Sequence, residues 1–138
     1  MTLDISQKAI ATSLLLEKSC KNMEQARRTA DLGYWDLVAN RLYYAVFHAV
    51  NAMLLIDGIK TGTHKGTSIQ FGKSYVLTGI FDRQDGILYS QLQTMREKAD
   101  YQNVFTIEEE VGRKLIESAN ELRMKIVDYV NQKLHTNS

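Results

Sequence analysis

The sequence predicts an all-α fold, an antiparallel up-and-down helical bundle of four long helices plus a short extra helix. Three observations support this prediction. The chain contains no proline, so no residue forces a kink or an extended linker. Apolar residues recur at spacings of three and four over several long segments, and no segment alternates as a strand would. No segment repeats at a fixed period, which argues against a helical repeat array.

Length and composition indicate one domain over residues 1–138, with a core over about residues 5–133 and a frayed tail over 134–138. The formal net charge of +1 gives no overall basic field, so any nucleic-acid site must be local. The single cysteine, Cys20, excludes an internal disulfide and fits a reducing compartment, and its place among helical positions predicts a small buried group. No signal peptide and no run of roughly 18 apolar residues is present, so we expect a cytoplasmic protein without membrane association.

The first two long helices are predicted over residues 5–31 and 34–56. Gly33 suits the left-handed cap that would end the first helix, and Asp57-Gly58 is a similar pattern after the second. The second helix is free of glycine and apolar on nearly every side, which predicts burial on most of its surface.

The short third helix is predicted to begin after Thr63, which can cap it, and to end at about Val76. The fourth helix is expected after Asp82, with Asp85 in its first turn as a capping partner, and ends near residue 100.

The fifth helix is predicted over residues 106–133. Thr106 and Glu109 have the spacing of a capping box at its start. The polar face of this helix carries two pairs spaced for ion pairing within the helix, Arg113 with Glu117 and Glu121 with Lys125.

A strip of polar residues interrupts the apolar second helix. Arg41, Tyr44, His48 and Asn51 fall within an arc of roughly 80° on one face. Leaving such groups buried and unpaired costs about 1–3 kcal/mol each, so they require partners or a ligand. The sequence therefore predicts either an internal polar network or a binding site along this face.

Two further segments are candidates for function. His64 and Lys65 open the third helix after a glycine-rich loop, where backbone amides can hold an anion, although the loop lacks the Walker spacing. Arg96 and Asp100 are spaced for an ion pair within the fourth helix, and Tyr101 follows them. The three histidines show no metal-ligand spacing, so we expect no metal and no cofactor.

Three blocks of residues carry a family resemblance. They are G-Y-x6-R-x-Y-Y-A-x-F from Gly33 to Phe47, T-H-K-G-x4-F from Thr63 to Phe71, and L-x3-R-x2-A-D-Y from Leu92 to Tyr101. In this order the chain resembles the HEPN domain, and within that group the small single-domain bacterial and archaeal branch.

The resemblance implies an antiparallel bundle of four helices plus a short one, commonly paired as a homodimer. It also implies nucleotide or RNA binding and a neighbouring nucleotidyltransferase, with the HEPN protein as toxin and the transferase as antitoxin. Active ribonucleases of the family carry R-x4-6-H near the start of a late helix.

This chain departs from that motif. Arg96 supplies the arginine, but Tyr101 stands where the histidine is expected. A phenol with a pKa near about 10 is a poor general base beside an imidazole near about 6.5. Arg41-x6-His48 fits the spacing formally, but on the central helix.

The leading hypothesis is a HEPN protein that binds a nucleotide or an RNA phosphate and acts with a partner nucleotidyltransferase in a toxin–antitoxin-like module. No residue is assigned a catalytic role. The binding candidates are Arg41, Tyr44, His48, His64, Lys65, Arg96, Asp100 and Tyr101. Two alternatives remain open: a metal-independent endoribonuclease toxin, and a catalytically inert dimeric interaction module in which the polar strip is an internal network.

Overall fold

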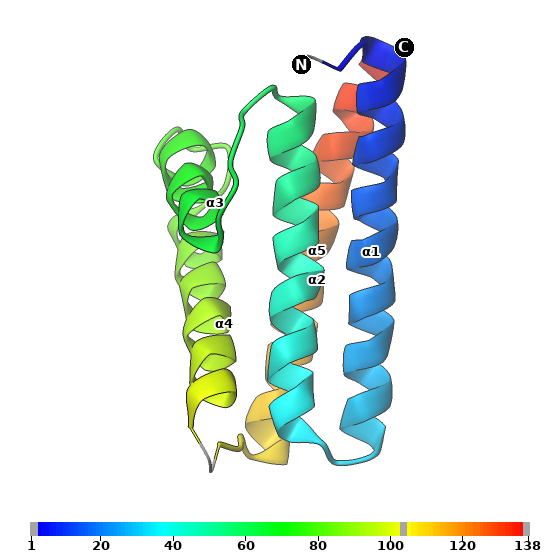
Figure 1. Cartoon of the computed structure of the whole chain (residues 1–138). Coiled ribbons are helices and arrows are strands. Elements are labelled where there is room, and N and C mark those ends of the chain that lie inside the picture. The colour runs from blue at the N-terminus through cyan, green and yellow to red at the C-terminus, as the bar shows by residue number, and fades with distance from the viewer. Residues whose placement is uncertain (1–2, 103–104, 137–138) are drawn as a thin grey trace.

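In the computed structural model, which describes residues 3–102 and 105–136, the chain forms an all-α up-and-down bundle. The long helices are α1 (Ile5–Asp31), α2 (Trp35–Ile56), α4 (Arg83–Tyr101) and α5 (Glu109–Thr136). The short helix α3 (His64–Phe71) continues into η1 (Gly72–Val76), a π-helical turn. α1 runs away from the end that holds both termini, α2 returns, α4 runs away again and α5 returns (Figure 1). The predicted fold class is confirmed.

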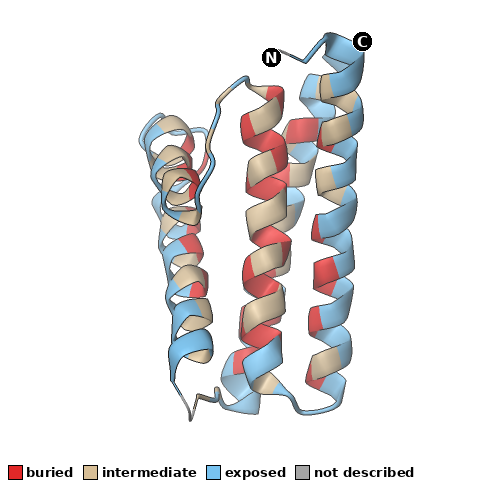
Figure 2. Cartoon of the chain, in the orientation of Figure 1, coloured by how far each residue is buried: buried red, intermediate tan, exposed pale blue. Residues whose placement is uncertain are grey.

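α2 is the centre of the bundle. It packs against α1, α4 and α5, and twelve of its 22 residues are buried. Figure 2 shows this burial on α2 and the exposed outer faces of α1 and α4. The burial follows from the sequence, because a helix that is apolar nearly all round must be covered on most sides.

Glycines end the first two helices, as the sequence predicts. Gly33 has a φ of +79° after α1, and Gly58 has a φ of +73° after α2. The left-handed region is open to glycine at little steric cost, which makes these sharp turns possible.

The start of α4 is also confirmed. The Asp82 carboxylate accepts a hydrogen bond from the Asp85 amide at 2.9 Å, and the Asp85 carboxylate accepts one from the Asp82 amide at 3.1 Å. This is the reciprocal capping box that the sequence predicts.

The prediction for the start of α5 is wrong. α5 begins at Glu109, so Thr106 is not its cap, and residues 105–108 are irregular. The half-buried Ile107 packs against the core, and an irregular segment lets it do so. Hydrophobic burial here outweighs the capping hydrogen bond that Thr106 could offer.

The other end of α5 also differs from the prediction. The helix continues through residues 134–136, which were expected to be frayed; residues 137–138 lie outside the described part. Leu134 is half-buried against the core, and this contact stabilises the last turn of the helix.

The ion pairs predicted within α5 are replaced by others. Glu117 pairs with Arg27 of α1 at 3.3 Å, and Arg113 pairs with Glu109 at 3.7 Å. Lys125 reaches the Asp85 carboxylate on α4. Glu117 and Lys125 therefore find their partners on α1 and α4, and not within α5 as the spacing predicts.

Cys20 is exposed, which corrects the expectation that it is buried. The preceding residue, Ser19, faces α2 and donates a hydrogen bond to the Ala45 carbonyl at 2.6 Å. One residue further along a helix turns a side chain by about 100°, which carries Cys20 to the outer face of α1.

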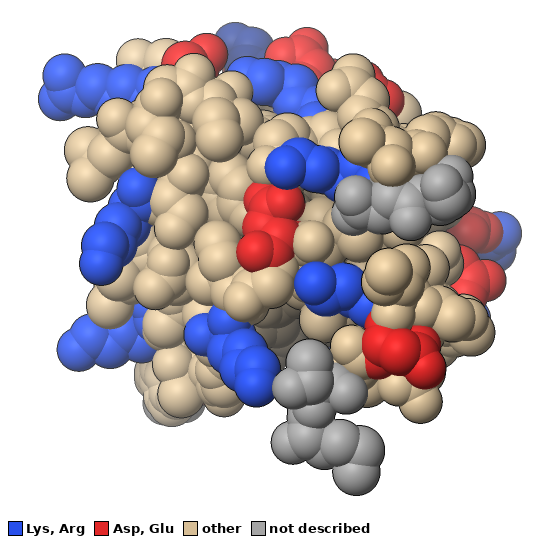
Figure 3. Space-filling view, turned by 90° about the horizontal axis from the view of Figure 1, so that it is seen from above, with Lys and Arg blue, Asp and Glu red and all other residues tan. Residues whose placement is uncertain are grey.

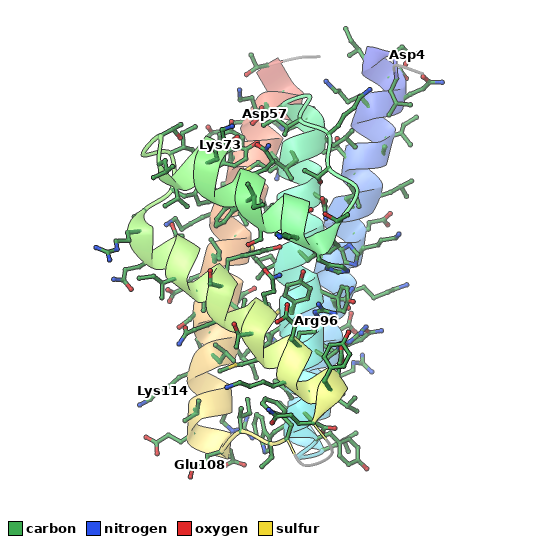
Figure 4. All side chains as sticks on the ribbon, turned by 60° about the vertical axis from the view of Figure 1, so that its left-hand side comes forward. Asp4, Asp57, Lys73, Arg96, Glu108 and Lys114 are labelled. Atoms are coloured by element: carbon green, nitrogen blue, oxygen red, sulfur yellow. The ribbon has the colours of Figure 1, made fainter. Side chains whose placement is uncertain are left out.

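A half-buried aspartate network joins the elements at the upper end of the bundle. The Asp57 carboxylate accepts hydrogen bonds from the hydroxyls of Tyr75 and Tyr129, each at 2.7 Å, and lies 3.4 Å from the Lys133 ammonium. The network connects the end of α2 to η1 and α5, and Figure 4 shows Asp57 at this end.

The described helices include none that is both long and apolar enough to cross a membrane. Seen from the end that carries the termini, basic and acidic side chains are interspersed over the surface (Figure 3).

Candidate functional site

The predicted polar strip lies along the half-buried face of α2, between α1 and α3. Arg41 donates a hydrogen bond to the Asn22 side chain of α1 at 2.9 Å. At the other end of the strip, the Asn51 side chain accepts one from Thr67 of α3 at 3.2 Å. Tyr44 and His48 lie between these two ends, with ring centroids 5.9 Å apart.

Arg41 is held mainly by amide oxygens. Its guanidinium donates to the side chains of Asn22, Gln25 and Asn40, and it lies over the Tyr44 ring with the Cζ atom 5.5 Å from the ring centroid. These bonds satisfy much of its donor capacity, as expected of an internal network.

A second group of side chains converges from three helices. Tyr43, Tyr44 and Phe47 of α2, His64 of α3 and Arg96 of α4 form what we call the Arg96 cluster. The Arg96 Cζ atom is 4.9 Å from the centroid of the Tyr43 ring, a cation–π contact. Figure 4 shows Arg96 between α4 and α2.

The His64 ring is fixed on two sides within the Arg96 cluster. It stacks on Phe47 with ring centroids 4.4 Å apart, and Tyr44 meets it edge-on at 5.9 Å. Its Nδ1 atom is hydrogen-bonded to the Tyr43 hydroxyl at 2.7 Å. α3 can place His64 here because Thr63 caps the helix, accepting a hydrogen bond from the Gly66 amide at 2.8 Å.

Arg96 retains unused hydrogen-bonding capacity. Its side chain is 14% exposed, and one of its nitrogens pairs with the Asp100 carboxylate at 3.2 Å. Its Nε atom is buried and has no hydrogen-bond partner among the described residues. Buried donors are normally satisfied, so a cation with an unused N–H group and one partly exposed carboxylate partner suits an anionic ligand.

Burial and nearby cations keep both histidines neutral. Burial lowers the pKa of His64, and the Arg96 charge lowers it further. Burial also lowers the pKa of His48, with smaller contributions from Lys18 and Arg41. The Tyr43 phenol changes in the opposite direction, because burial raises its pKa. Near pH 7 the phenol is therefore protonated, and both imidazoles are uncharged.

The remaining candidates lie at the surface. Lys65 is exposed in the first turn of α3, and the Tyr101 side chain is 83% exposed at the end of α4. The structure thus gathers Tyr44, His64 and Arg96, with His48 beside them. The two arginines do not share a contact: Arg41 lies over Tyr44, and Arg96 lies over Tyr43.

Among the described residues, no group of three or more His, Cys, Asp or Glu side chains could hold a metal ion. A hollow of about 620 Å³ on the outer face of α4 is lined by none of the candidate residues.

Sequence reasoning missed three aromatic residues. Tyr43 and Phe47 are four residues apart on α2, and Tyr89 is seven residues before Arg96 on α4, so each pair lies on one helix face. The Tyr89 ring is buried, with its centroid 6.1 Å from that of Tyr43. The sequence did contain a signal for Tyr89, because its spacing of seven residues from the candidate Arg96 places both side chains on the same face of α4.

A comparison with protein families identifies the family of the chain. The model of the HEPN domain matches residues 12–130. The chain belongs to the HEPN domain family. This confirms the resemblance on which the sequence interpretation depends.

Curated relatives of this HEPN protein include two from Methanocaldococcus jannaschii. One, named "Putative toxin MJ0142", is 26% identical over 119 residues, which cover 86% of this chain and 81% of the relative. The other, named "Putative toxin MJ0605", is 36% identical over 77 residues, or 56% of this chain and 57% of the relative. A UPF0332 protein of Archaeoglobus fulgidus is 28% identical over 119 residues, or 86% of this chain and 94% of the relative.

Proposed function

We propose that this HEPN protein binds a nucleotide or an RNA phosphate at the Arg96 cluster. The observation that carries the proposal is Arg96 itself, a largely buried cation with an unpaired Nε atom, held over Tyr43 beside a neutral His64. A guanidinium presents a planar fork of donors that matches two phosphate oxygens. In this proposal Asp100 orients Arg96 through their ion pair.

The neighbouring side chains would extend the site. Tyr44 is half-buried, and a base or a sugar could stack on its ring, a contact that tolerates any base. Lys65 and Tyr101 are exposed and would contact the parts of the ligand that project into solvent. His48 would contribute a hydrogen bond from the strip along α2, and Arg41, whose donors are held by amide oxygens, would contribute its charge.

Titration of AMP, ATP and a short RNA against the wild type and Arg96→Ala tests the binding proposal. Loss of a charged hydrogen bond costs about 1.5–3 kcal/mol, so we expect affinity to fall roughly ten- to a hundredfold. The matched control is Arg27→Ala, which removes an arginine that pairs with Glu117. Equal affinity of the wild type and Arg96→Ala, or binding by neither protein, would contradict the proposal.

We further propose that the protein acts as a homodimer in a toxin–antitoxin-like module with a nucleotidyltransferase partner. Two relatives are named as putative toxins, and this supports the role. Induced expression should slow growth, and both the Arg96→Ala substitution and co-expression of the proposed transferase partner should relieve this effect. Unaffected growth at high expression would count against a toxin, and a monomeric mass in solution would count against the dimer.

A metal-independent endoribonuclease is the second candidate. The specific observation in its favour is a neutral imidazole, His64, near the motif arginine Arg96, although residue 101 is not histidine. Imidazole transfers protons near neutral pH, which cleavage at the 2′-hydroxyl requires. Labelled RNA should be cut in EDTA, and His64→Ala or His48→Ala should abolish the cleavage. Intact RNA at high protein concentration would reject this candidate and leave binding or a purely structural role.

A further inference from the structure

We infer that Tyr43 is a positioning residue that holds the His64 imidazole as the Nε2–H tautomer, so that His64 meets a ligand oxygen as a hydrogen-bond donor. The part of this inference that concerns the ligand rests on the proposed function. The tautomer itself is a property of the free protein.

The geometry fixes which ring nitrogen faces Tyr43. The Tyr43 hydroxyl is 2.7 Å from Nδ1 of His64, and Tyr43 is fully buried. The His64 ring lies nearly parallel to Phe47, at 23°, while Tyr44 meets it edge-on at 80°. A half-turn of the ring would replace Nδ1 by a carbon atom and break the bond to Tyr43.

Counting protons then selects the tautomer. A neutral imidazole carries one N–H group, and a protonated phenol carries one O–H group. If Nδ1–H donated to Tyr43, the phenol hydrogen would need a different acceptor inside the core. Among the described residues, His64 is the one that hydrogen-bonds the Tyr43 hydroxyl.

The Tyr89 hydroxyl is the other polar group near Tyr43. It lies close enough to influence the pKa of Tyr43, but it has no hydrogen-bond partner among the described residues. An acceptor for the Tyr43 hydrogen is therefore His64 Nδ1 and not Tyr89. This leaves the imidazole proton on Nε2.

The charges around His64 favour the same arrangement. It faces Arg96 from α4, Tyr43, Tyr44 and Phe47 from α2, and the neighbouring imidazole of His48. The ionised group that acts on the pKa of His64 is the cation Arg96, so a second proton on His64 is disfavoured. A doubly protonated ring would also have no lone pair to accept from Tyr43.

The chemical consequence concerns Nε2. This atom has no hydrogen-bond partner among the described residues, and it does not belong to the buried unpartnered atoms, so it is open to solvent. With its proton fixed there, His64 presents one N–H donor close to the guanidinium of Arg96. Such a pair suits the unprotonated oxygens of a phosphate ester. In an RNA substrate His64 would donate a hydrogen bond to a phosphate oxygen and would not take a proton from the 2′-hydroxyl, because its lone pair on Nδ1 accepts from Tyr43.

Long-range ¹H–¹⁵N correlation spectra of histidine-labelled protein without ligand test the tautomer. We expect His64 to show an unprotonated Nδ1 and a protonated Nε2 at pH 7.5. In Tyr43→Phe the preference should be lost, while Tyr44→Phe, which removes a hydroxyl with no bond to His64, should leave the spectrum unchanged. A protonated Nδ1 in the wild type, or an unchanged spectrum in Tyr43→Phe, would overturn the inference. The wild-type spectrum decides the question even if Tyr43→Phe does not fold.

Titration with AMP separates this inference from the proposed function. Loss of the positioned donor should weaken AMP binding by Tyr43→Phe roughly two- to tenfold. Should the spectrum show the Nε2–H tautomer and the wild type bind none of AMP, ATP and the short RNA, the proposed function fails and the positioning role of Tyr43 stands. Should AMP bind in an Arg96-dependent manner to a protein with the Nδ1–H tautomer, the positioning role of Tyr43 fails and the proposed function stands.

Discussion

At the scale of single residues, burial decides the protonation of the candidate site. His48 and His64 are held among aromatic rings and near Lys18, Arg41 and Arg96, and their pKa values are lowered. Desolvation and like charge act in the same direction on an imidazole, since both penalise its cationic form. The site is therefore cationic through arginine and uncharged at histidine.

The lowered pKa values predict how stability depends on pH. Unfolding restores the histidines to about 6.5, so below that pH the unfolded chain takes up protons before the folded chain does. The free energy of unfolding should therefore fall as the pH drops from about 7 to about 5, and these two residues should contribute nothing above about pH 7. Urea unfolding of His48→Gln/His64→Gln should show a weaker pH dependence over this range. An identical dependence in this double variant and in the wild type would contradict the prediction.

A close approach between α2 and α5 gives the second residue-scale prediction. A Cβ atom on Gly112 would lie 2.5 Å from the Trp35 ring. Gly112→Ala should therefore lower the free energy of unfolding by about 1–3 kcal/mol through overpacking. Gly72→Ala is the matched control, because that position has open space and a φ of −63°. Gly72→Ala should leave the free energy of unfolding unchanged or raise it by about 0.4–1 kcal/mol, as measured by urea denaturation.

At the scale of elements, helix ends are decided by competition between caps and core contacts. Asp82 caps α4 with a reciprocal pair of hydrogen bonds, and the sequence shows the pattern. Thr106 shows a similar pattern, but Ile107 packs against the core and α5 begins at Glu109. The spacing of capping residues predicts a helix start reliably only where no neighbouring side chain packs against the core in a non-helical conformation.

These two positions form a matched pair for mutation. Asp82→Ala removes the cap of α4 and should reduce the free energy of unfolding by about 0.5–2 kcal/mol. Thr106→Ala should change it by less than about 0.5 kcal/mol, because Thr106 is exposed and caps no helix. Chemical denaturation of both variants measures the difference. Equal losses would show that Thr106 caps α5 in solution.

At the scale of the whole molecule, α2 is the element on which the others depend. α1, α4 and α5 all pack on it, and the buried side chains of α2 make up much of the core. α3 and η1 are short and contact the rest of the bundle less extensively. Resistance to local opening follows buried apolar contact, so it should differ between these parts.

Native-state hydrogen exchange should show this difference. Amides in the middle of α2 should exchange only through global unfolding, whereas amides of α3 and η1 should exchange through local opening of lower free energy. Peptides covering residues 38–54 and 64–76 report the two regions. Slower exchange in residues 64–76 than in residues 38–54 would contradict this view of the bundle.

Much of the fold follows from the sequence by itself. The absence of proline, the helical spacing of apolar residues and the glycines after α1 and α2 predict the helices and most of their limits. The apolar character of α2 predicts its central place, since no other position would cover it. The three sequence blocks predict the family, which the match over residues 12–130 shows.

Only the tertiary structure decided which polar groups meet. Arg41 was grouped with the ligand-binding residues, but amide oxygens of α1 and α2 satisfy it. Tyr43, His64 and Arg96 come from three helices and are far apart in the chain, so their contact depends on how α3 and α4 pack against α2. Sequence periodicity determines which face of a helix is apolar, whereas the angle and register of packing determine which side chains on different helices come within hydrogen-bonding distance.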